Sequence, residues 1–430
     1  MANDTCQTLR NKVIYEVYIR NHSAEGTFKG FQKDLARIKS LGVDIIWLMP
    51  IHPIGTLQKK GLLGCPYSIQ DYREVNPEYG TPDDFRSLVQ NIHQYGMQVM
   101  IDVVFNHTSH DSWLRNHHLE WFYHNANGEI DTKIEDWTDV IDLDYSHPDL
   151  WAYLIDTLKI WALEGVDGFR CDVAPLVPIQ FWQAARTELQ KVKPGVFWLA
   201  ESCDPSFIFF LRSQGFIGHS DGEIYQAFDM AYDYDVYHIF KAYLQGQASL
   251  EEYLNLKRQQ ETIYPVSFIK LRFLENHDQA RIRSMIFNEK TLRQWTAFAF
   301  FEKGVTLLYA GQETLDTKTP SLFNRELVDW SSLNQDFCQF VTTMSAIKKE
   351  PILSHGFYQI HKTRQSGVIW ASYRYNRQAL HGIFNVEGKC GFLEVDCQDG
   401  QYRNLIDGKV ITVKDGLMEL QDEPVIFLMD

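Results

Sequence analysis

One recurring pattern constrains the fold of this chain more than any other: a helical stretch ends in glycine and an apolar, β-rich run follows at once. Glycine just past a helix end adopts the left-handed conformation that other residues resist. Runs rich in Val, Ile, Met and Phe are typical of strands buried on both faces of a parallel sheet. The repeated junctions therefore predict βα units. They occur as SLG-VDIIWLMP at Gly42, QYG-MQVMIDVVF at Gly96, LEG-VDGFRCDVA at Gly165, KPG-VFWLAE at Gly195 and EKG-VTLLYAG at Gly304.

Three further segments, VIYEVYIR, EIYQAF and FIKLRF, bring the number of predicted strands to eight. Eight such strands favour a closed (β/α)8 TIM barrel over an open sheet, and polar residues that cluster after several different strands support the barrel. The fold class is therefore α/β. The predicted strands are 13–20, 43–49, 98–105, 167–173, 196–201, 223–228, 268–273 and 305–309.

Two segments depart from the βα rhythm. The first is polar and rich in histidine, with no regular period, and predicts a short insertion after the third strand. In the second, short strands such as GVIWASYRY alternate with turns such as DGK, which predicts a small antiparallel β domain. The predicted organisation is a catalytic barrel built from 1–106 and 147–351, an insertion at 107–146, and a C-terminal β domain at 352–430.

Charge and composition exclude several classes of partner. The net charge is −15 and no basic run occurs, which argues against nucleic acids and anionic membranes and favours a neutral small molecule. No apolar run reaches the ~20 residues of a membrane span, and the N-terminal MANDTCQTLRNK has no signal-peptide core. The seven cysteines include no C-x-x-C pair. A reduced, cytoplasmic protein is predicted.

The stretch GFRCDVA places two charges inside a predicted buried strand. Residues two apart on a strand share a face, so Arg170 and Asp172 lie side by side. Burial of charge is costly. The pair is therefore either a structural ion pair or a carboxylate that a guanidinium holds ionised and oriented for chemistry. This stretch alone leaves both interpretations open.

The working residues of a (β/α) barrel lie at the C-terminal ends of its strands. Those ends read DVVFNH, FRCD, LAES and LENHD, and they bring together three carboxylates, Asp172, Glu201 and Asp278, with Asp102 deeper in its strand. Glycoside hydrolysis requires a pair of carboxyl groups beside the scissile bond. Arg170 would keep Asp172 ionised, while Glu201, after the apolar WLA, would more easily hold its proton.

These four segments, in this order, resemble the four conserved segments of the α-amylase family, glycoside hydrolase family 13. Three supporting segments match as well: GTFKGFQKDLARIKSLGVDIIWLMPI, YSIQDYREVNPEYGTPDDF and GVTLLYAGQE. The resemblance covers about residues 13–330, and the β tail falls where the family places its C-terminal domain. In type, the chain is most similar to a bacterial intracellular α-amylase.

The resemblance implies a role for each site residue. Asp172 would be the nucleophile, Glu201 the general acid and then the base, and Asp278 the group that stabilises the transition state through the sugar hydroxyls. The other implied roles are orientation of Asp172 by Arg170, hydrogen bonds to the sugar from His107 and His277, stacking by Tyr67, and structural support by Asp102.

Two interpretations compete with these roles. Taken without the resemblance, Tyr67 has an alternative interpretation as an ordinary core residue. The histidines of the insertion would alternatively form a transition-metal site, although no ligand spacing repeats among them. They are His107, His110, His117, His118 and His124.

The resemblance also raises the question of calcium, which many α-amylases bind between barrel and insertion. Asn106 matches one family ligand and Asp142 resembles another. After the nucleophile, however, the chain reads Val-Ala-Pro175-Leu where the family often carries Lys-His. The chemistry itself is expected to need no cofactor, and a structural calcium ion stays open.

The predicted function is retaining hydrolysis of internal α-1,4-glucosidic bonds in maltooligosaccharides or starch-type glucans. Exo-acting relatives carry a stretch like GYDISDY, whose first aspartate holds the terminal sugar, whereas PYSIQDY here has Ser68 at that place. A neutral hydroxyl binds less strongly than a carboxylate. Two alternatives are a 4-α-glucanotransferase that uses the same carboxylates and a non-catalytic barrel that acts as a binding module.

Overall fold

A closed barrel of eight parallel strands forms the core of the fold, which confirms the predicted (β/α)8 architecture. The computed structural model describes residues 5–429, so that residues 1–4 and 430, the ends of the first and last predicted segments, lie outside the described residues. The strands follow the order β1-β10-β9-β8-β7-β6-β3-β2. They are β1 (Val13–Val17), β2 (Ile45–Leu48), β3 (Gln98–Val103), β6 (Gly168–Cys171), β7 (Phe197–Ala200), β8 (Met230–Tyr232), β9 (Lys270–Arg272) and β10 (Val305–Tyr309).

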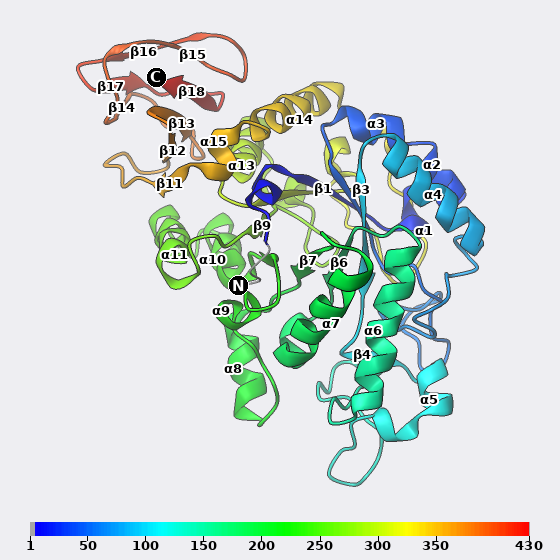
Figure 1. The fold of residues 1–430 in the computed structure, drawn as a ribbon. Helices are drawn as coiled ribbons and strands as arrows, with labels where there is room; N and C mark the ends of the chain where they lie inside the picture. Colours follow the sequence, from blue (N-terminus) through cyan, green and yellow to red (C-terminus); the bar gives the residue numbers. More distant parts are fainter. Residues whose placement is uncertain (1–4, 430) are drawn as a thin grey trace. The chain divides into compact units, whose positions relative to one another are not determined.

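Two compact units divide the chain. The first consists mainly of Ile14–Asp235 and Thr319–Asp329 and contains the strands from β1 to β8. Its helices are α1 (Ile19–His22), α2 (Phe28–Gln32), α3 (Leu35–Ser40), α4 (Pro82–Gln94), α5 (Trp113–His117), α6 (Pro148–Leu163), α7 (Ile179–Val192), α8 (Pro205–Ser213) and α9 (Asp221–Ile224). Within this unit α6 and α7 pack side by side (Figure 1).

The second unit consists mainly of Val236–Lys318 and Trp330–Asp430 and contains β9 and β10. Its helices are α10 (Tyr234–Leu244), which begins at the boundary between the units, α11 (Leu250–Ile263), α12 (Ile282–Met285), α13 (Glu289–Phe301), α14 (Gln335–Lys348) and α15 (Pro351–His355). Short 3-10 helices in the two units span Gln7–Asn11, Leu119–Trp121, Ala174–Leu176, Gln312–Thr314 and Trp330–Ser332.

The glycine junctions have the conformation that the sequence predicts. All five glycines have positive φ, from 68° at Gly96 to 148° at Gly304. At Gly304 a Cβ atom would also lie 2.2 Å from the carbonyl oxygen of Lys270, so no other residue fits there. These glycines end helices and direct the chain into the next strand of the barrel.

One of the eight predicted strands is wrong. Residues 223–228 do not form a strand, because α9 begins at Asp221 and β8 follows only at Met230. Ser220 and Glu223 form a capping box in which each side chain accepts a hydrogen bond from the other residue's backbone N–H. This S-x-x-E spacing is the helix-start signal that the strand prediction overlooked.

The insertion contains a small antiparallel ribbon. Strand β4 (His107–Ser109) pairs with β5 (Val140–Asp142), and His107 lies opposite Asp142. Helix α5 lies between these two strands in the sequence. This pairing ties the end of the insertion to the residues that follow β3.

The C-terminal segment forms two antiparallel four-stranded sheets, as predicted, and these are orange to red in Figure 1. Their inward side chains, including Trp370, Ile383 and Phe427, share one apolar core. The first sheet contains β11 (Phe357–Ile360), β12 (Ile369–Tyr375), β13 (Gln378–Phe384) and β18 (Val425–Met429); the second contains β14 (Phe392–Glu394), β17 (Leu417–Glu419), β16 (Val410–Lys414) and β15 (Gly400–Arg403). Among residues 5–429, no helix is both long and apolar enough to cross a membrane.

Candidate active site

Arg170 stands at the centre of the candidate site. Its side chain is fully buried in β6, and its Nη1 donates to Asp102 Oδ1 at 2.7 Å and to Asp172 Oδ1 at 2.8 Å. Its Nη2 lies 3.0 Å from Glu201 Oε1. One guanidinium therefore gathers three carboxylates, which is more than an isolated structural ion pair does.

The charge of Arg170 is secure in this environment. Burial alone would lower the pKa of the guanidinium, but the carboxylates of Asp102 and Glu201 outweigh burial and raise the pKa well above its usual value. The planar fork suits this task because it presents several donors in fixed directions.

The parallel ladder continues one residue past the strands and sets the positions of both carboxylates. The N–H of Asp172 donates to the carbonyl of Val103, and the N–H of Glu201 donates to the carbonyl of Cys171. Since β6 and β7 are hydrogen-bonded neighbours, the two acidic residues follow adjacent strand ends. Both residues are buried, at 6% and 8% exposure.

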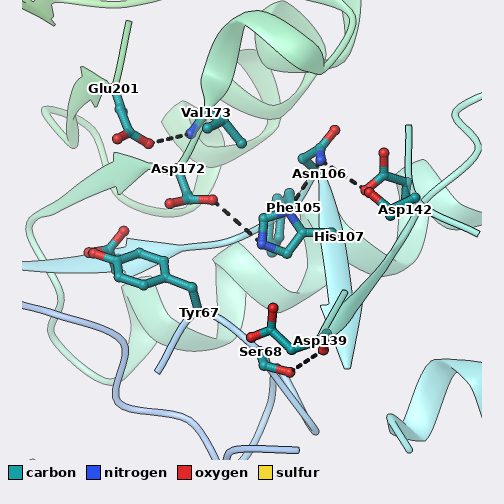
Figure 2. Close-up of polar contacts among 12 residues, drawn as sticks. Tyr67, Ser68, Phe105, Asn106, His107, Asp139, Asp142, Asp172, Val173 and Glu201 are labelled. Atoms are coloured by element: carbon teal, nitrogen blue, oxygen red, sulfur yellow. Dashed lines mark hydrogen bonds and ion pairs between the residues drawn. The ribbon is translucent and has the colours of Figure 1, made fainter. Parts of the chain in front are cut away.

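Glu201 lies in surroundings that differ from the apolar environment predicted for it. Its Oε2 accepts the N–H of Val173 at 2.7 Å (Figure 2). Its Oε1 lies 3.0 Å from Arg170 Nη2, and both contacts stabilise a charged carboxylate. Val173 itself has φ of 35°, a left-handed conformation that a β-branched residue rarely adopts. Such strain costs about 1–3 kcal/mol and clusters at functional sites. Here it accompanies an N–H directed at Glu201.

Asp102 and Tyr67 contact each other and lie next to Arg170. Asp102 is fully buried, and its Oδ2 accepts from Trp47 Nε1 and from the Tyr67 hydroxyl, each at 3.1 Å. The guanidinium of Arg170 lies 5.4 Å from the centroid of the Tyr67 ring. Tyr67 is thus tied to the charged cluster, and Asp102 contacts both Tyr67 and Arg170. The supporting role of Asp102 stays a prediction.

His107 faces the nucleophile candidate. Its Nε2 lies 3.8 Å from Asp172 Oδ2, a contact drawn in Figure 2. Its Nδ1 lies 3.2 Å from Asn106 Nδ2. Burial lowers the pKa of His107, with the charges of Asp142 and Asp139 opposing it, so the imidazole is neutral at pH 7.

His277 and Asp278 belong to the second unit, in the loop after β9. His277 is buried and its Nε2 lies 3.1 Å from Asp278 Oδ2. The preceding Glu275 anchors this loop, because its carboxylate accepts from Arg281 at 2.6 Å and from the N–H of Ile282 at 2.7 Å. The roles of His277 and Asp278 toward a sugar bound at Asp172 stay predictions.

The insertion's other histidines have local partners. Three meet backbone carbonyls and one meets a carboxylate: His110 with Thr138, His117 with Trp113, His124 with Phe122, and His118 with Glu120. Within residues 5–429, no group of three or more His, Cys, Asp or Glu side chains is arranged to hold a metal ion.

The two residues predicted as calcium ligands lie together but do not fit a calcium ion as they are arranged. Asn106 donates from Nδ2 to Asp142 Oδ1 at 3.2 Å, so its amide nitrogen faces the carboxylate (Figure 2). The other oxygen of Asp142 faces the ammonium of Lys133 at 3.6 Å. Calcium takes six to eight oxygen ligands, whereas here an amide nitrogen and an ammonium group face the carboxylate of Asp142.

The hydroxyl of Ser68, which stands where exo-acting relatives carry a sugar-binding aspartate, is already bonded within the protein. Its Oγ donates to the carbonyl of Asp139 at 2.8 Å, and the side chain is buried (Figure 2). The hydroxyl therefore ties the loop after β2 to the insertion. No carboxylate occurs at this position to hold a terminal sugar.

Sequence reasoning missed two aromatic residues of the site. Trp47 bonds Asp102, and the hydroxyl of Tyr232 accepts from Arg170 Nε at 3.2 Å. Tyr232 lies on β8, the strand that was predicted in the wrong place, so its side chain was not assigned to the barrel. Trp47 lies inside a correctly predicted strand, where an aromatic residue carries no signal that separates site from core.

Comparison with known proteins identifies the family. The chain matches "Alpha amylase, catalytic domain" over residues 16–139 and 117–350. It belongs to the alpha-amylase family. Residues 359–427 match "Bacterial Alpha amylase C-terminal domain". As a member of this family the chain is a glycoside hydrolase, and the family acts on α-glucans.

Solved structures and curated relatives agree with this assignment. An alpha-amylase from Lactobacillus plantarum is 44% identical, with a TM-score of 0.96 over 99% of this chain and 100% of the other. A maltogenic alpha-amylase from Thermotoga neapolitana is 33% identical, with a TM-score of 0.88 over 98% and 99%. The curated intracellular maltogenic amylase of Bacillus subtilis is 28% identical over 76% of this chain and 55% of its own length.

Proposed function

We propose that this family member is a retaining glycosidase that cleaves internal α-1,4-glucosidic bonds of maltooligosaccharides or starch-type glucans. The observation that carries the proposal is the buried guanidinium of Arg170, which bonds Asp172 and lies 3.0 Å from Glu201 at adjacent strand ends. Glycoside hydrolysis uses a pair of carboxyl groups placed beside the scissile bond. The chemistry needs no cofactor.

In the proposed reaction Asp172 attacks the anomeric carbon while Glu201 gives a proton to the leaving oxygen. The glycosidic C–O bond breaks and a bond from carbon to Asp172 forms. Glu201, now a carboxylate, then takes a proton from water, whose oxygen displaces Asp172. Two inversions retain the α configuration. Because its contacts with Arg170 and the Val173 N–H favour the carboxylate, Glu201 must take up a proton and exchange its contact with Arg170 for the leaving oxygen before it acts as the acid.

The remaining site residues have supporting roles in the proposal. Asp278 would stabilise the oxocarbenium-like transition state through the sugar hydroxyls, and Tyr67 would stack on the sugar ring. The imidazoles of His107 and His277 would donate hydrogen bonds to the sugar in the same subsite. Asp102 would hold Arg170 and Tyr67 in place. Its carboxylate accepts hydrogen bonds from Arg170 at 2.7 Å and from Tyr67 at 3.1 Å.

Internal cleavage follows from the lack of a carboxylate at the Ser68 position, and it can be tested directly. Maltoheptaoside that carries a chromogenic reporter and is blocked at its non-reducing end should release the reporter at a rate within about threefold of the unblocked compound. No charged group there fixes the terminal sugar. Inertness toward the blocked substrate would contradict endo-action, and products longer than an unblocked maltopentaose substrate would indicate a 4-α-glucanotransferase instead.

The proposal extends to domain layout and location. We assign residues 1–106 and 147–351 to the catalytic barrel, 107–146 to an insertion that borders the site, and 352–430 to the C-terminal β domain. The seven cysteines, all within residues 5–429, form no disulfide, and one relative is named as intracellular; both support a cytoplasmic enzyme that receives maltodextrins. The net charge of −15 argues against a nucleic-acid partner.

A further inference from the structure

Asp142 is a fully buried carboxylate at the end of the insertion. Its Oδ1 accepts from Asn106 Nδ2 at 3.2 Å and from Thr132 Oγ1 at 3.4 Å. Its Oδ2 accepts the backbone N–H of Lys133 at 3.0 Å. These donors are neutral dipoles, and an ionised carboxylate at such depth requires a counter-charge as well.

The side chain of Lys133 supplies this counter-charge. Its Nζ lies 3.6 Å from Asp142 Oδ2 and donates to the carbonyl of Leu143 at 3.4 Å. The same ammonium lies 5.6 Å from the centroid of the Tyr123 ring, within the range of a cation–π contact. Only 18% of the lysine side chain is exposed. The ammonium of Lys133 thus faces the carboxylate of Asp142 and the backbone carbonyl of Leu143. Carboxylate and carbonyl oxygens are the ligand types that a calcium ion prefers.

We infer that the ammonium of Lys133 takes the place of a structural divalent cation between barrel and insertion in this chain. It neutralises Asp142, the last residue of β5, and its contact with Leu143 holds the backbone just after that strand. A divalent ion brought to the same carboxylate would meet this ammonium at close range and be repelled. The joint between barrel and insertion is therefore independent of metal ions.

A short chain of contacts connects Asp142 to Asp172. Asp142 holds Asn106 at 3.2 Å, Asn106 meets His107 Nδ1 at 3.2 Å, and His107 Nε2 lies 3.8 Å from Asp172 Oδ2. Lys133 is thus a positioning residue that acts through Asp142 and Asn106 on the imidazole. Its loss should disturb sugar binding by His107 more than the chemical step.

The experiment compares thermal unfolding and kinetics of the full chain. Wild-type protein should have the same Tm, within about 1 °C, in EDTA and in millimolar calcium chloride, and should retain no stoichiometric metal after dialysis. Lys133→Met, which keeps the length of the side chain without its charge, should lower Tm by about 5 °C or more. Well below that temperature its KM for maltoheptaose should rise about 3- to 10-fold, with a smaller change in kcat.

Lys29→Met is the matched control, because Lys29 pairs with Asp84 at 2.8 Å but is 73% exposed. Surface pairs contribute little, so its Tm and KM should stay at the wild-type values. The inference is overturned if EDTA lowers the wild-type Tm by about 5 °C or more together with loss of bound calcium. It is equally overturned if Lys133→Met keeps the wild-type Tm and KM. If Lys133→Met does not fold, the wild-type comparison with and without calcium decides alone.

Discussion

Asp172→Asn is expected to fold normally and to lose at least ~10⁴-fold in kcat/KM on maltooligosaccharides, or about 5.5 kcal/mol of transition-state stabilisation. An amide oxygen still accepts the hydrogen bond that Arg170 Nη1 now gives to Asp172 at 2.8 Å, so the fold is retained. An amide cannot attack the anomeric carbon as a carboxylate does. Steady-state kinetics and circular dichroism of the same preparation measure both effects.

The control for this substitution is Asp149→Asn, at an exposed position near the start of α6. It makes the same chemical change away from the site and should leave kcat/KM within about twofold of wild type. A soluble Asp172→Asn protein that keeps more than a tenth of wild-type activity would contradict the role of Asp172.

Arg170→Lys is expected to have the second-largest effect, a loss of about 10²–10³-fold in kcat/KM. The guanidinium reaches two carboxylates through Nη1, a third through Nη2, and Tyr232 through Nε. A single ammonium cannot span these directions, so at least one buried carboxylate loses its donor. The Tm should fall by several degrees as well, since an unpaired buried charge is costly.

Arg186→Lys separates the catalytic from the structural part of this loss. Arg186 donates to both carboxylate oxygens of Asp229, from Nη2 at 2.7 Å and from Nη1 at 2.9 Å. Its side chain is 12% exposed, and it belongs to the same unit as Arg170. Its replacement should lower Tm comparably while kcat/KM stays within about threefold of wild type. If Arg170→Lys and Arg186→Lys lose activity equally, the role of Arg170 is structural and the catalytic assignment is contradicted.

Local signals in the sequence were sufficient for most of the barrel. Glycines with left-handed φ, such as Gly96, mark helix ends and so place the following strands. The period of two in β6 put Arg170 and Asp172 on one face, and their bond at 2.8 Å agrees. The strand β8 was missed because it has only three residues and follows a helix whose capping box at Ser220 was overlooked.

Contacts between distant segments could not be predicted in the same way. The apolar WLA before Glu201 suggested apolar surroundings, but the donors beside its carboxylate come from β6 and from the strained backbone at Val173. Lys133 meets Asp142 only because the insertion folds back on itself, and no spacing in the sequence encodes that meeting. Such pairings depend on tertiary packing.

The most direct test of the account is to trap the covalent intermediate. A fluorinated α-maltosyl fluoride has an activated leaving group and a ring fluorine that slows the second displacement, so a nucleophilic carboxylate accumulates as its ester. Mass spectrometry of the digested protein should find the sugar on the peptide that contains GFRCDVA, at Asp172, and find none in Asp172→Asn. A sugar attached to Glu201, Asp278 or any other residue would contradict the account.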